Sequence, residues 1–197
     1  MKNFGYLLLV ILYCNCSTTK EKNAPINDYL ESQKLGDQKI MVIQEKINNN
    51  VTIDIFKGKI YFEPLSNQYE RNEGIQEPLY DKTKWEKMKS KYENSYITDF
   101  WIRNNNWSSK DFKIQNILFF ERAKFPNPGK YEKFDFQDYY TVFSFSDPIY
   151  YNKKYAVFTF QKTNTKAMIL GNTSILVLEK KNGKWVEVDG AVDGIYN

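Results

Sequence analysis

The 197-residue chain contains no histidine and only two cysteines, Cys14 and Cys16, which lie close together near its start. Without histidine the chain alone cannot form a Ser-His-Asp triad, a Cys-His dyad or a histidine-based zinc site. Two cysteines at this spacing form neither a zinc ribbon nor a CxxC redox motif. These absences remove the commonest routes to nucleophilic and metal-assisted catalysis, and we predict no cofactor and no metal site.

The chain also lacks a concentrated run of positive charge. Lys and Arg outnumber Asp and Glu by only 28 to 24, and the basic residues are spread along the sequence. A nucleic-acid-binding domain usually gathers its basic residues into a stripe on one face. We therefore expect no nucleic-acid partner. With 42% hydrophobic residues, the composition is that of a globular domain, and the length predicts one such domain.

No apolar run is long enough to cross a membrane as a helix. The longest one covers residues 4–13 and follows the basic Lys2. A secretory signal has an apolar core of about 7–15 residues, whereas a membrane-spanning helix needs about 20. The run therefore predicts a cleaved signal peptide. The alternative is a buried first element of the domain, and the polar segment that follows at once argues against it.

Cysteine directly after the short apolar run resembles a bacterial lipoprotein signal, in which the new N-terminal cysteine carries fatty acyl chains such as palmitate. Two positions are open. Cys16 follows the modest Asn15, and Cys14 follows the bulky Tyr13. The residue before the cut is the most restricted in size, so Cys16 is favoured and Cys14 is the alternative. This predicts a signal peptide over 1–15, a flexible tether over 16–24 and a single domain over 25–197.

In the first half of the chain, helices are predicted over 25–35 and from Thr83 to about Asn94. Thr83 and Glu86 form a capping-box pattern, and an apolar stripe beginning at Trp85 follows at helical spacing. In the first of these helices, Asp28 and Glu31 resemble a capping pair. Apolar alternation around Lys57-Gly58 predicts a β-hairpin over 51–62. A polar loop is expected over 66–78.

The last sixty residues carry the clearest strand signals. Strands are predicted over 139–145, 155–161, 174–180 and 184–188, and Asn182-Gly183 is a typical hairpin turn between the last two. No alternation of strand and helix indicates βαβ units. The fold class predicted is α+β: an antiparallel sheet with a C-terminal four-stranded meander and two or three helices packed on one face.

Two segments resemble a family of small, mostly uncharacterised lipoproteins of Bacteroidetes-type bacteria. The first is the Ser-Asp-Pro-Ile-Tyr unit and its returning Tyr-Ala-Val strand over 146–158. The second is the strand with the Asn-Gly-Lys-Trp hairpin over 174–185. The resemblance implies export and anchorage to the cell envelope, at the outer membrane. It brings no established activity and no catalytic residues.

Aromatic residues make up 17% of the chain, enough to form a recognition surface as well as a core. Exposed Trp and Tyr side chains suit sugar faces and protein interfaces. Candidates for such a surface stand next to breaks or in doublets: Trp101, Trp107, Tyr140 and Tyr151. The alternative for each is packing in the core.

Carboxylates are the remaining candidates for acid–base chemistry. None lies in a recognisable motif, and we predict no catalytic residue among them: Glu121, Asp135, Asp138, Asp147, Glu187, Asp189 and Asp193. Glu187 and Asp189 alternate along a predicted strand and should face one solvated side. The two Asp-Gly steps at 189–194 predict a turn rather than a calcium loop.

These patterns together predict a lipid-anchored protein of the cell envelope that acts by binding a protein or glycan partner. An envelope hydrolase using paired carboxylates and a purely structural envelope component are the alternatives.

Overall fold

The computed structural model describes residues 21–61, 81–125, 139–151, 154–166 and 171–193, and for 58–61 the backbone only. The predicted signal peptide with Cys14 and Cys16, the predicted loop over 66–78, and Asp135 and Asp138 lie outside these residues.

The described chain has a mixed α/β architecture built on a seven-stranded sheet, which is not closed into a barrel. The path of hydrogen-bonded strands runs β4 (Ile117–Phe120), β1 (Lys39–Ile43), β5 (Tyr140–Phe145), β7 (Tyr155–Asn164), β8 (Ser174–Lys181) and β9 (Lys184–Val192). The short β6 (Ile149–Tyr151) pairs with β7 beside this path. A separate two-stranded sheet joins β2 (Glu45–Ile47) to β3 (Trp101–Asn106).

The prediction of an antiparallel sheet is wrong for the N-terminal half. β1 lies between β4 and β5 and runs parallel to both. The pairs from β5 to β9 are antiparallel. Because β6 intervenes in the chain between β5 and β7, the C-terminal strands also depart from a simple four-stranded meander. Parallel pairing joins segments that are distant in sequence, and no local pattern announces it.

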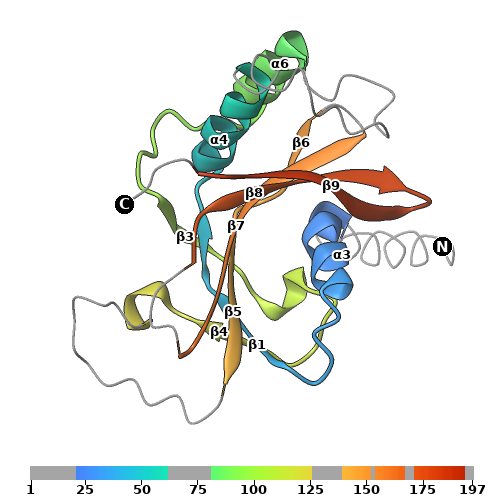
Figure 1. Ribbon diagram of the computed structural model, residues 1–197. Helices are drawn as coiled ribbons and strands as arrows, with labels where there is room; N and C mark the ends of the chain where they lie inside the picture. The colour runs from blue at the N-terminus through green and yellow to red at the C-terminus, as the bar shows by residue number, and fades with distance from the viewer. Residues whose placement is uncertain (1–20, 62–80, 126–138, 152–153, 167–170, 194–197) are drawn as a thin grey trace, which may run out of the picture.

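Three α-helices in the described part of the chain cover both faces of the sheet rather than one, as Figure 1 shows. Helix α3 (Ala24–Ser32) lies on one side of the β8–β9 hairpin and packs against β9. Helices α4 (Asn49–Tyr61) and α6 (Lys82–Tyr92) contact each other on the other side. The prediction that all helices share one face is therefore wrong. No described helix is long and apolar enough to cross a membrane.

Residues 51–61 of the segment predicted as a hairpin over 51–62 belong to helix α4, and residue 62 lies outside the described residues. Thr52, Ile53 and Phe56 are buried, and their spacing is that of one helical face. Asn48 begins the helix, because its Oδ1 accepts a hydrogen bond from the Asn50 N–H at 3.0 Å. The β-branched residues read as a strand in isolation, but burial of this face against the sheet outweighs that preference.

Helix α6 forms where it was predicted, with Trp85 and Met88 buried. Its cap is different: Asp81, not Thr83, accepts a hydrogen bond from the Lys84 N–H, at 2.8 Å. In α3 the predicted capping role of Asp28 is also wrong. Asn23 occupies the N-cap position, and Asp28 lies buried inside the helix.

The core consists of three clusters. The largest fills the α3 side of the sheet and is centred on Phe143, Phe145 and Phe158. A second lies under α4 and α6 and includes Phe56 and Tyr151. The third is small and consists of Met41, Ile43, Phe125 and Val142. It lies beside β1 and β5, and the candidate aromatic residues divide between these clusters.

Candidate functional site: a half-buried aromatic surface and a buried ion pair

Two of the four aromatic residues predicted for recognition are fully enclosed. Trp107 is 2% exposed, and its indole N–H donates to the Phe145 carbonyl at 3.2 Å. Tyr151 is 0% exposed, and its hydroxyl donates to the Asp81 carbonyl at 3.0 Å. Both rings pack in the core and have no face left for a ligand. The recognition role predicted for these two residues is therefore wrong.

The other two, Trp101 and Tyr140, are brought together by the fold. Both are half-buried and pack against the small cluster around Met41 and Val142. Phe120 packs against the same cluster and is also half-buried. We call Trp101, Phe120 and Tyr140 the aromatic surface. Phe120 carries no sequence signal for this surface, because a Phe-Phe pair in an apolar run is typical of a buried strand.

Cations lie beside two of the three rings. The Arg122 guanidinium carbon is 5.8 Å from the centroid of the Trp101 ring, and the Lys39 Nζ is 5.9 Å from that of Tyr140. The Arg122 backbone N–H donates to the Glu45 carboxylate at 2.7 Å, while its buried Nε has no hydrogen-bond partner among the described residues. Aromatic faces flanked by cations suit a ligand with apolar faces and negatively polarised oxygens.

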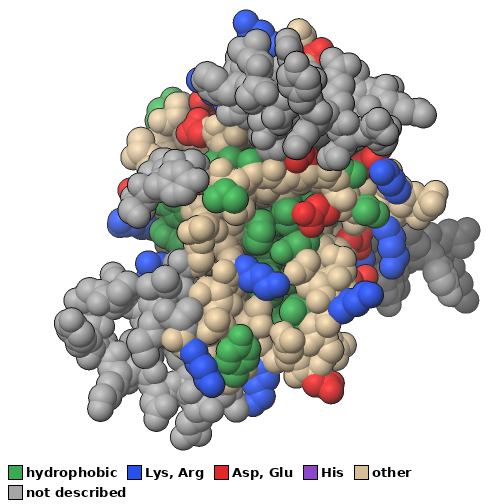
Figure 2. Space-filling model, in the orientation of Figure 1, with side chains coloured by type: hydrophobic (Ala, Val, Ile, Leu, Met, Phe, Trp, Pro, Cys, Tyr) green, Lys and Arg blue, Asp and Glu red, His purple; other side chains and the backbone are tan. Residues whose placement is uncertain are grey.

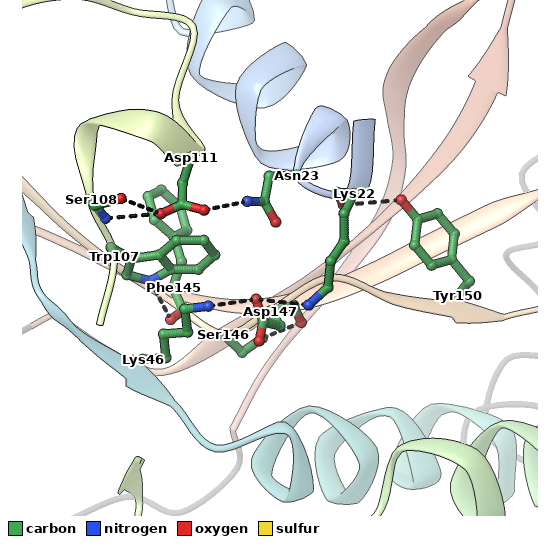
Figure 3. A network of polar contacts seen from close by, with 10 residues as sticks. All are labelled: Lys22, Asn23, Lys46, Trp107, Ser108, Asp111, Phe145, Ser146, Asp147 and Tyr150. Atoms are coloured by element: carbon green, nitrogen blue, oxygen red, sulfur yellow. Dashed lines mark hydrogen bonds and ion pairs between the residues drawn. The ribbon is translucent and has the colours of Figure 1, made fainter. Parts of the chain in front are cut away.

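A second arrangement is a buried ion pair where β2 approaches the end of β5 (Figure 3). The Lys46 Nζ lies 3.0 Å from the Asp147 Oδ1, and the two side chains are only 8% and 14% exposed. The same Nζ lies 4.2 Å from the centroid of the Trp107 ring. The lysine charge is therefore balanced by a carboxylate and by the ring face. Because its amine is paired with Asp147 and covered by the Trp107 ring, Lys46 suits a structural role and not that of a nucleophile.

The start of the described chain reaches the same place. The Lys22 Nζ lies 3.8 Å from the Asp147 Oδ1, and the Lys22 carbonyl accepts a hydrogen bond from the Tyr150 hydroxyl at 3.1 Å. Asn23 is 2% exposed and donates to the Asp111 Oδ1 at 3.0 Å. Lys22 and Asn23, which the sequence assigned to the tether, thus contact the domain, and the chain free to act as a tether ends before Lys22.

The turn that contains Asp111 positions its carboxylate for the hydrogen bond with Asn23. Asp111 closes the 3₁₀ helix η1 (Ser109–Asp111), and its Oδ2 accepts from both the N–H and the hydroxyl of Ser108, each at 2.9 Å. Asn27, fully buried on α3, donates to the Asp111 carbonyl and accepts from the Lys113 N–H. These side chains fix the beginning of α3 to the turn that carries Trp107.

Of the described carboxylate candidates, Asp147 lies in this region, paired with Lys46, and no second candidate is seen beside it. Glu121 forms an exposed ion pair with Lys124. Glu187 is exposed on β9 and Asp189 is half-buried on the same strand. Although Glu187 is exposed overall, partial desolvation of its carboxyl group against the protein, and then the nearby Asp189 charge, raises its pKa above the ordinary value. Residues 189–192 continue β9, so the turn predicted there is wrong for that part of the chain.

Lys46 and Asn23 could not be predicted as site residues from the sequence, because neither stands in a motif. A lysine in a short strand and an asparagine before a proline-led helix are typical of solvated positions. Only the tertiary fold reveals that both are buried and paired. Comparison of the chain with protein-family models, with curated proteins and with solved structures finds no match.

Proposed function

We propose that this chain is an exported, lipid-anchored protein of the cell envelope that binds a protein or glycan partner through its aromatic surface. The observation that carries the binding role is the gathering of Trp101, Phe120 and Tyr140, half-buried, over one small cluster. Side chains that are half covered are held in place and still present a face, which lowers the entropy lost on binding.

Anchorage is supported by the sequence and by where the fold begins. Cys16 follows a short apolar run, and Lys22 is already attached to the domain. The segment between them is a polar connection between a lipid and a folded domain. Several acyl chains hold a protein stably at a membrane, whereas one chain alone is marginal.

The anchor is tested by labelling the full-length protein in cells with an alkyne fatty acid. The wild type should take up the label, Cys14→Ala should keep it, and Cys16→Ala should lose it. Loss in Cys14→Ala with retention in Cys16→Ala would move the anchor to Cys14. Absence of label in the wild type would overturn the proposal of lipidation.

The binding role is tested by placing a photo-crosslinking amino acid at Trp101 in the anchored protein. A crosslinked protein band, or retention on purified envelope polysaccharide, should appear and should weaken in Tyr140→Ala. Tyr96 provides the control, because it is 96% exposed and lies outside the aromatic surface. Equal crosslinking from Tyr96 and Trp101, or none from either, would contradict a binding role for this surface and favour a structural component.

A hydrolase remains the second candidate because of one observation, the raised pKa of Glu187 next to Asp189. A carboxyl group with a raised pKa keeps its proton to a higher pH, which suits a general acid. Release of soluble sugars from envelope glycans by the wild type but not by Glu187→Gln would favour this candidate over binding.

A further inference from the structure

We infer that the turn of the β8–β9 hairpin faces the membrane, with its lysines against anionic lipid headgroups. This inference rests on the proposed lipid anchor, and it adds which surface of the domain the anchor presents to the bilayer. The first supporting observation is the short distance that the anchoring segment can span.

Six peptide units separate Cys16 from Lys22, the earliest described residue that hydrogen-bonds to the domain. A fully extended chain spans at most about 3.3–3.6 Å per residue, so the attachment point lies within about 20 Å of the lipid. A domain of this length is about 40 Å across, given its expected radius of gyration. The anchor is therefore short compared with the domain, and the surface around Lys22 must stay near the bilayer.

A continuous line of contacts runs from Lys22 to the hairpin. The Tyr150 hydroxyl donates to the Lys22 carbonyl, and the Tyr150 ring lies 5.7 Å from the ring of Trp185 on β9. The Trp185 ring in turn lies 5.8 Å from the Lys180 Nζ on β8. The start of α3 and the end of the hairpin thus belong to one surface, as their places in Figure 1 also show.

This surface is rich in lysine. Exposed lysines lie on or next to the hairpin and at the attachment point: Lys22, Lys154, Lys180, Lys181 and Lys184. Four acidic residues offset most of their charge: Asp147 lies 3.8 Å from the Lys22 Nζ, Glu187 is exposed on β9, and Glu179 and Glu21 lie beside the other lysines. Glu179 pairs with Lys154 and Lys181, each at 2.9 Å, and Glu21 is exposed beside Lys22. The five lysines outnumber these four acidic residues by one, and in Figure 2 blue side chains lie with red ones among them at the right-hand edge, where Figure 1 places the hairpin.

Anionic lipid headgroups fit both the short anchor, which keeps this surface near the bilayer, and the lysines that the surface carries. Lysines close to a membrane are attracted to anionic lipids within about one Debye length, roughly 8–10 Å at physiological salt. Trp185 is 7% exposed and packs in the largest core cluster, so its ring holds the hairpin in place and does not reach the lipid. Helix α6 also carries lysines, but Figure 1 places it at the top of the molecule, away from the hairpin turn. Because Lys22 lies beside the hairpin, the hairpin reaches the bilayer first.

The test uses the acylated full-length protein reconstituted into vesicles. Mature protein has no cysteine other than the acylated one, so an introduced cysteine can be labelled alone with a fluorophore. Lys184→Cys reports on the hairpin and Lys87→Cys, an exposed lysine on α6, is the matched control. Quenching by a spin label on the lipid headgroup is measured in phosphatidylcholine vesicles with and without phosphatidylglycerol.

The Lys184→Cys probe should lose more fluorescence than the Lys87→Cys probe, and the difference should grow with phosphatidylglycerol and shrink at high salt. When the Lys184→Cys protein also carries Lys180→Glu and Lys181→Glu, phosphatidylglycerol should increase the quenching of its probe by less. Equal quenching of the two probes, or stronger quenching at Lys87→Cys, would overturn the inference while leaving the anchor intact. Failure of the protein to float with the vesicles would instead overturn the anchor itself.

Discussion

The side chain of Asp28 accepts a hydrogen bond from the backbone N–H of Trp185 over 2.8 Å, although the two residues stand 157 positions apart. Trp185 lies on β9, at one end of the described strand path. The carboxylate thus satisfies an N–H that the sheet itself does not use, and Lys113 lies 3.4 Å from its other oxygen. Through this contact α3 closes part of a sheet edge that would otherwise offer itself to another chain.

Replacing Asp28 with alanine should lower the free energy of unfolding by about 1–3 kcal/mol, because a buried N–H loses its acceptor. Urea denaturation measures the loss. Asp28→Asn keeps an oxygen that can accept from Trp185 and should cost less, and Asp37→Ala, at an exposed position, should cost almost nothing. Equal stability of Asp28→Ala and Asp37→Ala would show that the contact has no energetic role.

Replacing Lys46 with methionine should lower the free energy of unfolding by about 3–5 kcal/mol, because Asp147 is left buried without its main partner. Lys22→Met should cost far less, since the Lys22 side chain is 57% exposed and its ion pair is longer. Thermal and urea unfolding of the two variants give the comparison.

The double variant Lys46→Met with Asp147→Leu should recover most of that loss, because it removes both buried charges together. If the double variant is no more stable than Lys46→Met alone, then packing of the lysine stem against Trp107, rather than the ion pair, accounts for the cost.

The N-cap of α6 is Asp81 in the structure, whereas the sequence predicts Thr83. Asp81→Ala should cost about 0.5–2 kcal/mol, because the Lys84 N–H loses its acceptor. Thr83→Ala should cost little, since Thr83 is exposed inside the helix. Chemical denaturation measures both changes in the free energy of unfolding. A larger decrease for Thr83→Ala than for Asp81→Ala would show that Thr83 caps the helix after all.

Glu187 should make stability depend on pH in the acidic range. Its pKa is higher in the folded protein than the ordinary 4.5, so ionisation costs more in the folded state than in the unfolded one. Stability should therefore fall as the pH rises from below 4.5 through the raised pKa. Glu187→Gln should have a higher Tm than the wild type near neutral pH and the same Tm below the ordinary pKa. A constant difference across this range would contradict the assignment.

Elements with local signals could be predicted from the sequence. The β8–β9 hairpin turns at Asn182-Gly183, both with positive φ, as the Asn-Gly step indicates. The buried face of α6 follows from the spacing of Trp85 and Met88. In each case the residues that determine the structure are close neighbours in the chain.

Features that depend on distant partners could not be predicted. The alternation of Val51, Ile53 and Ile55 favours a strand, and only the sheet beneath makes this segment a helix. The burial of Lys46 depends on Asp147, about a hundred residues away, and on the ring of Trp107. Of the candidate site, sequence analysis identified Trp101 and Tyr140 as aromatic candidates, but their joint position over one cluster required the fold.

The pairing of β1 with β5, distant in the chain, has a kinetic consequence. Residues 39–43 pair with β5, which ends at residue 145, and α3 packs on β9, which ends at residue 192. The first segments of the domain thus complete their contacts only when almost the whole chain is present. Such high contact order slows folding. A nascent chain of this kind stays unfolded for most of its synthesis, which is the state in which a polypeptide can be threaded through a narrow translocation channel.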